Sequence, residues 1–430
     1  MTATLDSATG ATPAAAPAAP SVAPASFSPG SAMTRRQKLM YIVVLGALVA
    51  LGPFTVDMYL PAFPTVAADL LASDAAIQLT LTATTIGFAL GQLIVGPLSD
   101  SLGRKRPLIA ATVLHILASI AVVLAPTIEW VMVGRVLQGV GAAGGAVVAM
   151  AMVRDLFAGQ ALIRMLARMA LVTGLAPVIA PVIGSQLLNV MDWRGLFVVL
   201  ALYGALVALV VGGVIRETLP VERRGGTSLK ATRVRYAHLL SDASFVGIAL
   251  VGAFTFSALF AYLSASSFVL QDVFGLSAQE YGIVFGANSI GLVIANQTSA
   301  RLMRVLAPRA VATGGLIIML AGAVLLAVGD LLDLGLVGVL VPLFFVVASV
   351  GVIMPTVQIT ALANHGAEAG TAASLIGALN FGVAGLVSPL VGVLGVSVMS
   401  MAIVMVACLI AANAVFWIVV RPRVQATAIA

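Results

Sequence analysis

Twelve long apolar runs follow one another along this chain and constrain its fold more than any other feature. A hydrocarbon layer about 30 Å thick is crossed by roughly 20 apolar residues in a helix. The runs cover approximately 39–62, 76–99, 107–125, 129–153, 162–189, 194–215, 244–271, 278–300, 308–329, 334–360, 367–393 and 396–420. Barrel strands would alternate polar and apolar residues, which these runs do not. The sequence therefore predicts an all-α polytopic membrane protein with twelve transmembrane helices.

Composition excludes several other classes of protein. Only 9% of the residues are charged, whereas soluble proteins carry about a quarter. The net charge of +6 does not indicate nucleic-acid binding, because the basic residues occupy short loops between the apolar runs. The single cysteine, Cys408, cannot form a disulfide within the chain, and we expect it to pack or face lipid. No nucleotide loop, nucleophile triad or metal-ligand cluster appears, so we expect no enzyme and no cofactor.

The basic residues also predict the orientation in the membrane. Twenty lysines and arginines fall on one side of the predicted helices, Arg194 falls on the other, and Arg135 lies within a run. Acidic residues such as Asp69, Glu129 and Asp272 fall on the side opposite the basic cluster. Because positive loops stay in the cytoplasm, we expect both termini to be cytoplasmic and the protein to lie in the inner membrane.

The order of the runs divides the chain into two halves. A six-helix bundle over 39–215 and a second over 244–420 are joined by a basic cytoplasmic connector over 216–243. Residues 1–38 form a tail whose Ala, Pro and Ser content predicts disorder, and residues 421–430 form a second cytoplasmic tail. Residues 91–104 and 291–304 match at five ungapped positions, which indicates two pseudo-symmetric halves unless two apolar segments agree by chance.

A glycine-rich basic turn follows the second run. It reads Gly96-Pro-Leu-Ser-Asp100-Ser-Leu-Gly103-Arg104-Lys105-Arg106. Glycines permit a tight turn and close helix approach, and the aspartate can pair with Arg104 or cap the next helix. The turn resembles the cytoplasmic signature of the major facilitator superfamily, in which such contacts latch the cytoplasmic side, although Ser101 replaces the usual arginine. The alternative is a simple stop-transfer charge cluster.

Arg135 lies in the fourth run, in Gly134-Arg135-Val-Leu-Gln138-Gly139. A charge within the membrane costs at least about 2.5 kcal/mol by insertion scales, so it is expected to be paired and functional. Gln138 shares its helix face. The segment resembles the superfamily's fourth-helix motif, whose arginine is associated with proton coupling. The alternative is an interfacial arginine that reaches outward.

Asp57 is the one carboxylate that we place within a run. It lies near the outer end of the first run, at roughly the depth of Arg135 in the fourth. Desolvation and a nearby arginine shift a carboxyl pKa in opposite directions, so a carboxylate poised between them can bind and release a proton. We therefore predict Asp57 and Arg135 as the proton-coupling pair. The alternative is that the first helix ends at Val56 and that Asp57 is a rim residue.

The fifth run contains Gly174-Leu-Ala-Pro177-Val-Ile-Ala-Pro181-Val-Ile-Gly184. Two prolines and flanking small residues weaken the helical ladder and permit bending and close packing. The segment resembles the antiporter motif of the superfamily's exporters, with Ala180 in place of one glycine. The alternative is an ordinary packing helix.

Three further segments narrow the resemblance. The stretch from Val56 to Pro64 closely resembles the first-helix signature of the Bcr/CflA drug-resistance subfamily, as do Val153–Phe157 and Gly370–Ser374. The resemblance covers 40–420. It implies two six-helix bundles that rock around a central site, proton-driven export of small hydrophobic drugs or metabolites, and a monomeric transporter.

The alternatives to export differ in the polar groups that they need. A proton-coupled importer of a sugar or organic solute needs several polar groups in its cavity, and the runs offer few. A receptor or scaffold has no need of Asp57 and Arg135 at matched depth. His115 could titrate or be a hydrogen-bonded packing residue. The polar and aromatic residues that we expect to line a substrate cavity are Tyr59, Gln138, Phe254, Tyr262, Asn288 and Asn380.

Overall fold

The computed structural model describes residues 30, 33–224, 229–363, 365 and 368–421, and these residues form helices joined by short turns. Most of the predicted N-terminal tail and residues 422–430 of the C-terminal tail lie outside them. The first half contains α1 (Arg35–Asp57), α2 (Phe63–Asp69), α3 (Asp74–Leu102), α4 (Lys105–Val123), α5 (Ile128–Leu156), α6 (Gly159–Leu187) and α7 (Trp193–Val214). The second half contains α9 (Ala243–Phe268), α10 (Ala278–Leu302), α11 (Pro308–Leu331), α12 (Gly335–Leu362), α13 (Ala369–Val387), α14 (Pro389–Val393) and α15 (Val398–Val415).

Polar caps mark where several helices begin. Thr34 and Gln37 form a capping box at the start of α1, and the Ser73 hydroxyl accepts the Ala76 N–H at the start of α3. Asp192 accepts the Gly195 N–H at the start of α7 in the same way. These side chains satisfy N–H groups that a helix leaves without partners. The spanning helices begin within a few residues of the predicted starts of the apolar runs.

Eleven of the described helices are long and apolar enough to span a membrane. The remaining predicted span forms α10, whose 25 residues give about 38 Å of helix, enough to cross. It is less apolar because it carries Asn288, Asn296 and Gln297 among other polar residues, and it packs between α6 and α12.

One face of α7 is apolar and exposed. Leu202 and Leu209 on this face are 64% and 75% exposed, as expected for side chains that face lipid.

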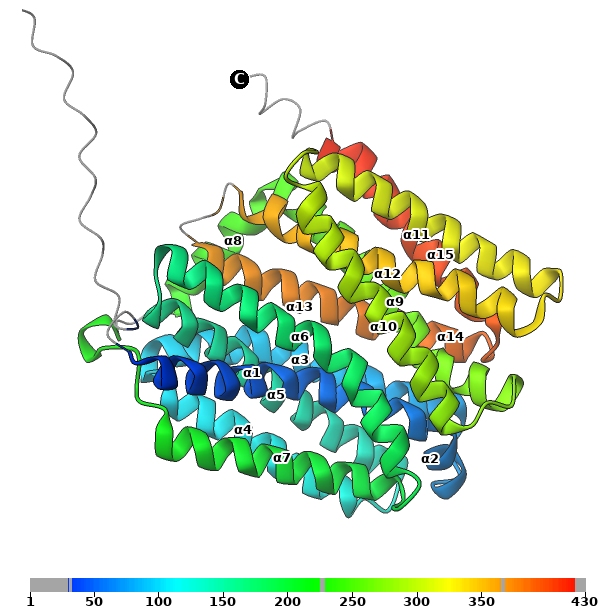
Figure 1. The fold of residues 1–430 in the computed structure, drawn as a ribbon, viewed down its shortest axis with the longest axis horizontal. Helices are drawn as coiled ribbons and strands as arrows, with labels where there is room; N and C mark the ends of the chain where they lie inside the picture. The colour runs from blue at the N-terminus through cyan, green and yellow to red at the C-terminus, as the bar shows by residue number, and fades with distance from the viewer. Residues whose placement is uncertain (1–29, 31–32, 225–228, 364, 366–367, 422–430) are drawn as a thin grey trace, which may run out of the picture.

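Each half packs as a bundle, and the two bundles lie side by side (Figure 1). Within each half, glycines allow the second and fourth spans to approach closely. A Cβ at Gly139 on α5 would collide with the Thr84 carbonyl on α3, and a Cβ at Gly351 on α12 with the Leu292 carbonyl on α10. Between the halves, α3 packs against α13 and α6 against α10. These two interfaces frame the space at the centre of the molecule.

The two ends of the helices differ in charge, and we name them accordingly. The basic end is the one where α1 begins, where α3 turns into α4 at Arg104, and where α10 turns into α11 near Arg304; the opposite end is the distal end. Two details at these ends depart from the predicted runs. The connector contains a helix, α8 (Leu229–Ser241), and the predicted run 367–393 breaks at Ser388, where Pro389 starts α14.

Candidate functional site

A cavity of about 500 Å³ lies between the two halves. Its walls are mainly aliphatic and aromatic and come from α1, α3, α5 and α6 on one side and α9, α10, α12 and α13 on the other. Phe88 of the first half stacks on Phe381 of the second, with ring centroids 4.8 Å apart, and Phe256 meets Phe381 edge-on at 5.1 Å. The cavity therefore suits a small, largely apolar molecule and is in contact with both halves.

Among the described residues that line this cavity, Asp57 is the one acidic residue. It is the last residue of α1 and is only 6% exposed. The chain continues past it through a 3₁₀ turn at Leu60–Ala62 and then α2, so the carboxylate is enclosed rather than on an outer rim. Within the part of the chain that the structure describes, Asp57 has neither an ion-pair partner nor a side-chain hydrogen bond. An unpaired carboxylate in an apolar wall carries a large free-energy cost when it is charged.

Arg135 is fully buried behind the same wall. Its guanidinium donates to the Thr55 carbonyl at 2.8 Å and to the Gln138 side chain at 3.0 Å, and it lies 4.8 Å from the centre of the Tyr59 ring. A helix leaves its last carbonyls without partners, and Thr55 is in the last turn of α1. Arg135 thus secures the end of the helix that carries Asp57. It forms no ion pair with Asp57, so the predicted pair is linked through the backbone.

The contacts of Arg135 continue into a buried polar network. Gln138 donates to the Ser119 hydroxyl at 2.7 Å, and Ser119 donates to the His115 carbonyl. The His115 ring nitrogen Nε2 lies 2.8 Å from the Thr55 hydroxyl. His115 is therefore a buried, hydrogen-bonded residue. The network joins α1, α4 and α5 to one another behind the cavity wall.

The predicted cavity residues divide into two groups. Tyr262 and Asn380 line the cavity. Tyr59 and Gln138 do not, because both turn towards Arg135 behind the wall. Two others also lie outside the lining. Asn288 donates to the Tyr262 hydroxyl at 3.1 Å, and Phe254 packs against the hydrophobic core.

Sequence reasoning missed Gln92, Ser289 and Gln358, which line the cavity. Each is a polar residue inside a predicted span, and such residues usually face a bundle interior. That signal alone could have identified them.

The predicted antiporter motif lies on α6, where the two halves meet. A proline lacks an N–H, so Pro181 leaves the carbonyl of Pro177 free. The Ser289 hydroxyl of α10 lies 3.3 Å from that oxygen and donates to it. Gly184 allows the Met58 carbonyl to approach so closely that a Cβ would collide with it, and Gly174 lies against Val293. The motif therefore joins α6 to α10 and to the chain just beyond Asp57.

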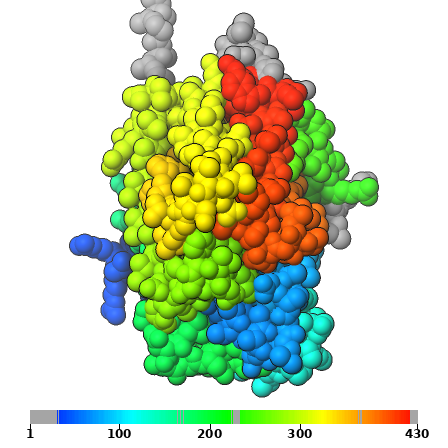
Figure 2. Space-filling model, turned by 90° about the vertical axis from the view of Figure 1, so that its right-hand side faces the viewer, coloured from blue at the N-terminus to red at the C-terminus, as the bar shows by residue number. Residues whose placement is uncertain are grey.

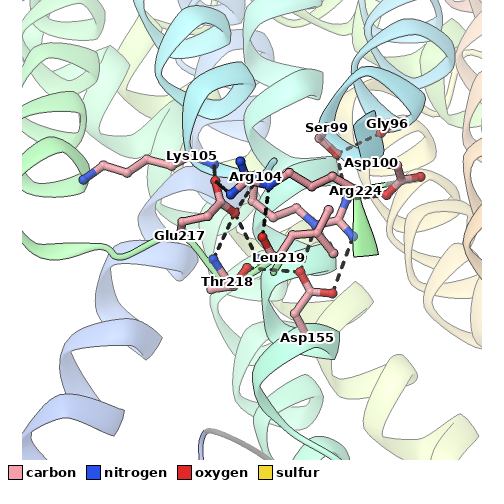
Figure 3. A network of polar contacts seen from close by, with 10 residues as sticks. All are labelled: Gly96, Ser99, Asp100, Arg104, Lys105, Asp155, Glu217, Thr218, Leu219 and Arg224. Atoms are coloured by element: carbon pink, nitrogen blue, oxygen red, sulfur yellow. Dashed lines mark hydrogen bonds and ion pairs between the residues drawn. The ribbon is translucent and has the colours of Figure 1, made fainter. Parts of the chain in front are cut away.

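At the basic end, Arg104 is the centre of a polar cluster (Figure 3). It pairs with Asp100 one turn earlier and donates to Ser99 at 2.9 Å and to Asp155, at the end of α5, at 2.8 Å. Gly103 has a φ of +89°, a conformation that favours glycine and that turns the chain from α3 into α4. Lys105 reaches the Gly212 carbonyl on α7 at 2.8 Å. The predicted latch residues therefore connect α3, α4, α5 and α7.

Glu217 completes this cluster and was not predicted from the sequence. Its carboxylate accepts the backbone N–H groups of Arg104 at 2.8 Å, Lys105 at 3.1 Å, and Thr218 and Leu219 at 3.0 Å each. Burial disfavours the charged form, but these four donors together hold the pKa of Glu217 below its usual range. Glu217 thus caps the start of α4, whereas Asp100 takes the other of its two predicted roles and pairs with Arg104.

A second, polar cavity of about 320 Å³ separates the halves at the basic end. Gly96, Asp100 and Arg154 line it from the first half, and Thr371 and Ser374 of α13 face them. In the described residues, the hydrogen bonds that join the two spanning bundles lie at the centre or towards the distal end. Gln271 donates to the Pro61 carbonyl at 3.1 Å, and Gln279 to the Ser185 carbonyl at 2.9 Å. Figure 2, which looks onto the distal end, shows the atoms of both halves in contact.

Two histidines and a carboxylate meet near α8, although sequence spacing predicts no metal-ligand cluster. Ligand-capable atoms of His238, His365 and Glu368 lie within 4.8 Å of one another. His365 Nε2 also lies 3.0 Å from Asp242, the N-cap of α9. These contacts tie the connector to the second half.

The family model for the Major Facilitator Superfamily matches residues 43–389 of this chain. The chain belongs to this superfamily. YdgK of Bacillus subtilis, an uncharacterized MFS-type transporter, is 34% identical over 91% of this chain and 98% of its own length. A bicyclomycin resistance protein homolog of Haemophilus influenzae is 31% identical over 83% of this chain and 90% of its own.

Solved structures of the superfamily share the fold at low identity. A D-xylose–proton symporter superposes with a TM-score of 0.70 at 14% identity, covering 88% of this chain and 97% of the other. A bacterial homolog of the human lysosomal transporter Spinster, in an inward-facing form, gives 0.68 at 16% identity, covering 90% and 98%. The chain is therefore a multi-pass membrane transporter of the superfamily and not an enzyme, and its relatives include multidrug resistance proteins.

Proposed function

We propose that this transporter is a proton-coupled antiporter that exports hydrophobic drugs or metabolites across the inner membrane. The observation that carries the proposal is the unpaired carboxylate of Asp57 in the largely apolar cavity between the halves. An apolar or weakly cationic compound fits such a cavity, and a proton on Asp57 relieves the cost of its charge. The names of the Haemophilus and MdtL relatives support drug export as the direction of transport.

In an alternating-access cycle, the basic end and the distal end of the transporter open in turn to the two sides of the membrane. Because positive loops stay in the cytoplasm, the basic end is the cytoplasmic one, and both termini lie there. Cross-half hydrogen bonds towards the distal end and a polar cavity at the basic end support an inward-facing form. In this form substrate enters from the cytoplasm and Asp57 gives up its proton. After the halves rock, Asp57 is protonated from outside and substrate leaves.

The remaining motifs have supporting roles in this cycle. Arg135 holds the end of α1 and so fixes the depth of Asp57. The cluster of Gly96, Asp100, Gly103, Arg104 and Lys105 engages α13 across the polar cavity when the cytoplasmic side closes. One proton moving down 100 mV supplies about 2.3 kcal/mol, which supports an export gradient of roughly 50-fold.

Inverted membrane vesicles from an efflux-deficient bacterium test the proposal. Their lumen is acidified by respiration, and chloramphenicol, ethidium and bicyclomycin are added in turn while luminal pH is recorded. We expect at least one compound to release protons in wild type and not in Asp57→Asn, whereas Asp333→Asn, the same change outside the spans, behaves like wild type. No response to the whole panel, with a response to sugars or organic acids, would favour the importer instead.

A further inference from the structure

A basic pocket of about 310 Å³ lies between α1 and α6 at the basic end, away from the central cavity. Lys38 of α1 and Arg164 and Arg168 of α6 contribute its charge. Ile42 and Phe157 contribute apolar walls. The pocket therefore combines a cluster of cations with an apolar base, a pairing that the transport cycle above does not use.

In the part of the chain that the structure describes, the three cations have no acidic partners. Among the described residues, no carboxylate lines the pocket and none of Lys38, Arg164 and Arg168 forms an ion pair. The side chains of Arg164 and Arg168 are exposed, and they lie one helical turn apart, so they share a face of α6. Three like charges around one pocket repel one another and favour an anion between them.

The exposed apolar side chains beside the pocket and the length of α6 indicate that the pocket lies near the edge of the hydrocarbon layer. On α1, Leu39 and Val43 are 59% and 61% exposed, and on α6 Leu171 is 52% exposed, so apolar side chains continue from the pocket along both helices. The 29 residues of α6 give about 43 Å of helix, roughly 13 Å more than the hydrocarbon layer. Arg168 lies nine residues after Gly159, about 13 Å along the helix, and so at the layer's edge if this excess lies at the basic end.

We infer that this pocket binds the headgroup phosphate of an anionic phospholipid, with the acyl chains along the exposed apolar side chains of α1 and α6. A free phosphate offers the same charge but would make no contact with the exposed apolar side chains of α1 and α6. A zwitterionic headgroup brings an ammonium group towards three cations. The inference goes beyond the proposed function, because it concerns the lipid around the transporter and not its substrate or its proton.

The test measures lipid binding to the purified full-length protein. Affinity for phosphatidylglycerol is compared with that for phosphatidylcholine by native mass spectrometry and by the rise in melting temperature in nanodiscs. Each basic residue near an anionic surface contributes about a fivefold gain in affinity. We therefore expect the triple variant Lys38→Gln, Arg164→Gln, Arg168→Gln to bind phosphatidylglycerol on the order of 100-fold more weakly.

Matched variants distinguish the loss of the pocket's cations from the loss of positive charge elsewhere at the basic end. Arg301→Gln, Arg304→Gln, Arg309→Gln removes as many charges from the basic end of the other half and should keep wild-type affinity. Arg164→Lys, Arg168→Lys keeps the charge and should also bind. If the triple pocket variant does not fold, Arg168→Gln alone should bind about fivefold more weakly.

Three results would overturn the inference. One is equal loss of affinity in the pocket and control variants, and another is equal binding of phosphatidylcholine by wild type. The third is equal stabilisation by inorganic phosphate, which would make the pocket a site for soluble anions. Transport plays no part in these readouts, so they stand apart from the antiport proposal.

Discussion

Adding one methyl group at Gly139 is expected to force α3 and α5 apart. A Cβ there would lie 2.9 Å from the Phe88 nitrogen and 3.0 Å from the Gly87 Cα, and closer still to the Thr84 carbonyl oxygen. Ordinary contacts of this kind need about 3.5 Å or more. All three neighbours are backbone atoms, which cannot rotate away as a side chain would. The helices must therefore separate by roughly half an ångström or more.

The size of the effect follows from two opposing terms. Alanine gains up to about 1 kcal/mol over glycine in a helix, and overpacking costs about 1–3 kcal/mol. In Gly139→Ala the steric term applies in full. In Gly213→Ala on α7, no described atom beyond the surrounding helix backbone lies within 4 Å of the new Cβ, so only the gain remains. We expect Gly139→Ala to be less stable than Gly213→Ala by about 1–3 kcal/mol.

Thermal unfolding of the purified protein in one detergent, followed by tryptophan fluorescence, measures this difference. Gly139→Ala should melt below wild type, and Gly213→Ala at or above it. Since Phe88 lies at the displaced backbone and lines the cavity, drug-evoked proton release should fall as well. Equal melting temperatures for the two variants would refute the inference that α3 and α5 are held at backbone contact.

Two further predictions concern the basic end and the cavity. Glu217→Gln should destabilise the protein by about 1–2 kcal/mol, because its backbone hydrogen bonds lose a charged acceptor. The folded-state pKa of Glu217 is lowered, so its contribution is present above its ordinary pKa of 4.5 and is lost as pH falls through the folded value. The melting temperatures of wild type and Glu217→Gln should therefore differ fully at pH 7, and the difference should shrink as the pH falls below 4.5 and through the lowered folded-state pKa of Glu217. Phe381→Ala removes an aromatic ring from the cavity wall, and a contact between that ring and an aromatic drug is worth about 0.5–1.5 kcal/mol. The drug concentration that gives half-maximal proton release in vesicles should therefore rise about 2- to 10-fold. An unchanged concentration would place the drug elsewhere.

The helical architecture was predictable because membrane helices are set mainly by a local property, the length of an apolar run. The break at Ser388 and the connector helix α8 were not predicted from the sequence. Pro389 starts a new helix inside an apolar stretch that hydropathy alone treats as continuous. The α8 segment is too polar to appear in a search for spans.

The candidate site was only partly predictable because its partners are set by tertiary packing. Arg135 stood out as a charge within a span, yet its partner is the Thr55 carbonyl, and a backbone atom leaves no residue-type signature. Glu217 lies 113 positions from Arg104, whose N–H it accepts, so no local motif connects them. Whether a polar side chain faces the cavity or the buried network depends on the local course of the backbone. Tyr59 lies in the turn after α1 and points to Arg135, whereas Tyr262 lies on α9 and lines the cavity.

Proton release on substrate binding tests the central claim most directly. Purified protein in a weakly buffered detergent solution is mixed with the compound that gives the largest vesicle response, while pH and binding are recorded together. We predict that wild type releases protons as it binds and that Asp57→Asn binds the compound without releasing them, with Asp333→Asn as the matched control. Undiminished proton release by Asp57→Asn would contradict the assignment of coupling to this carboxylate.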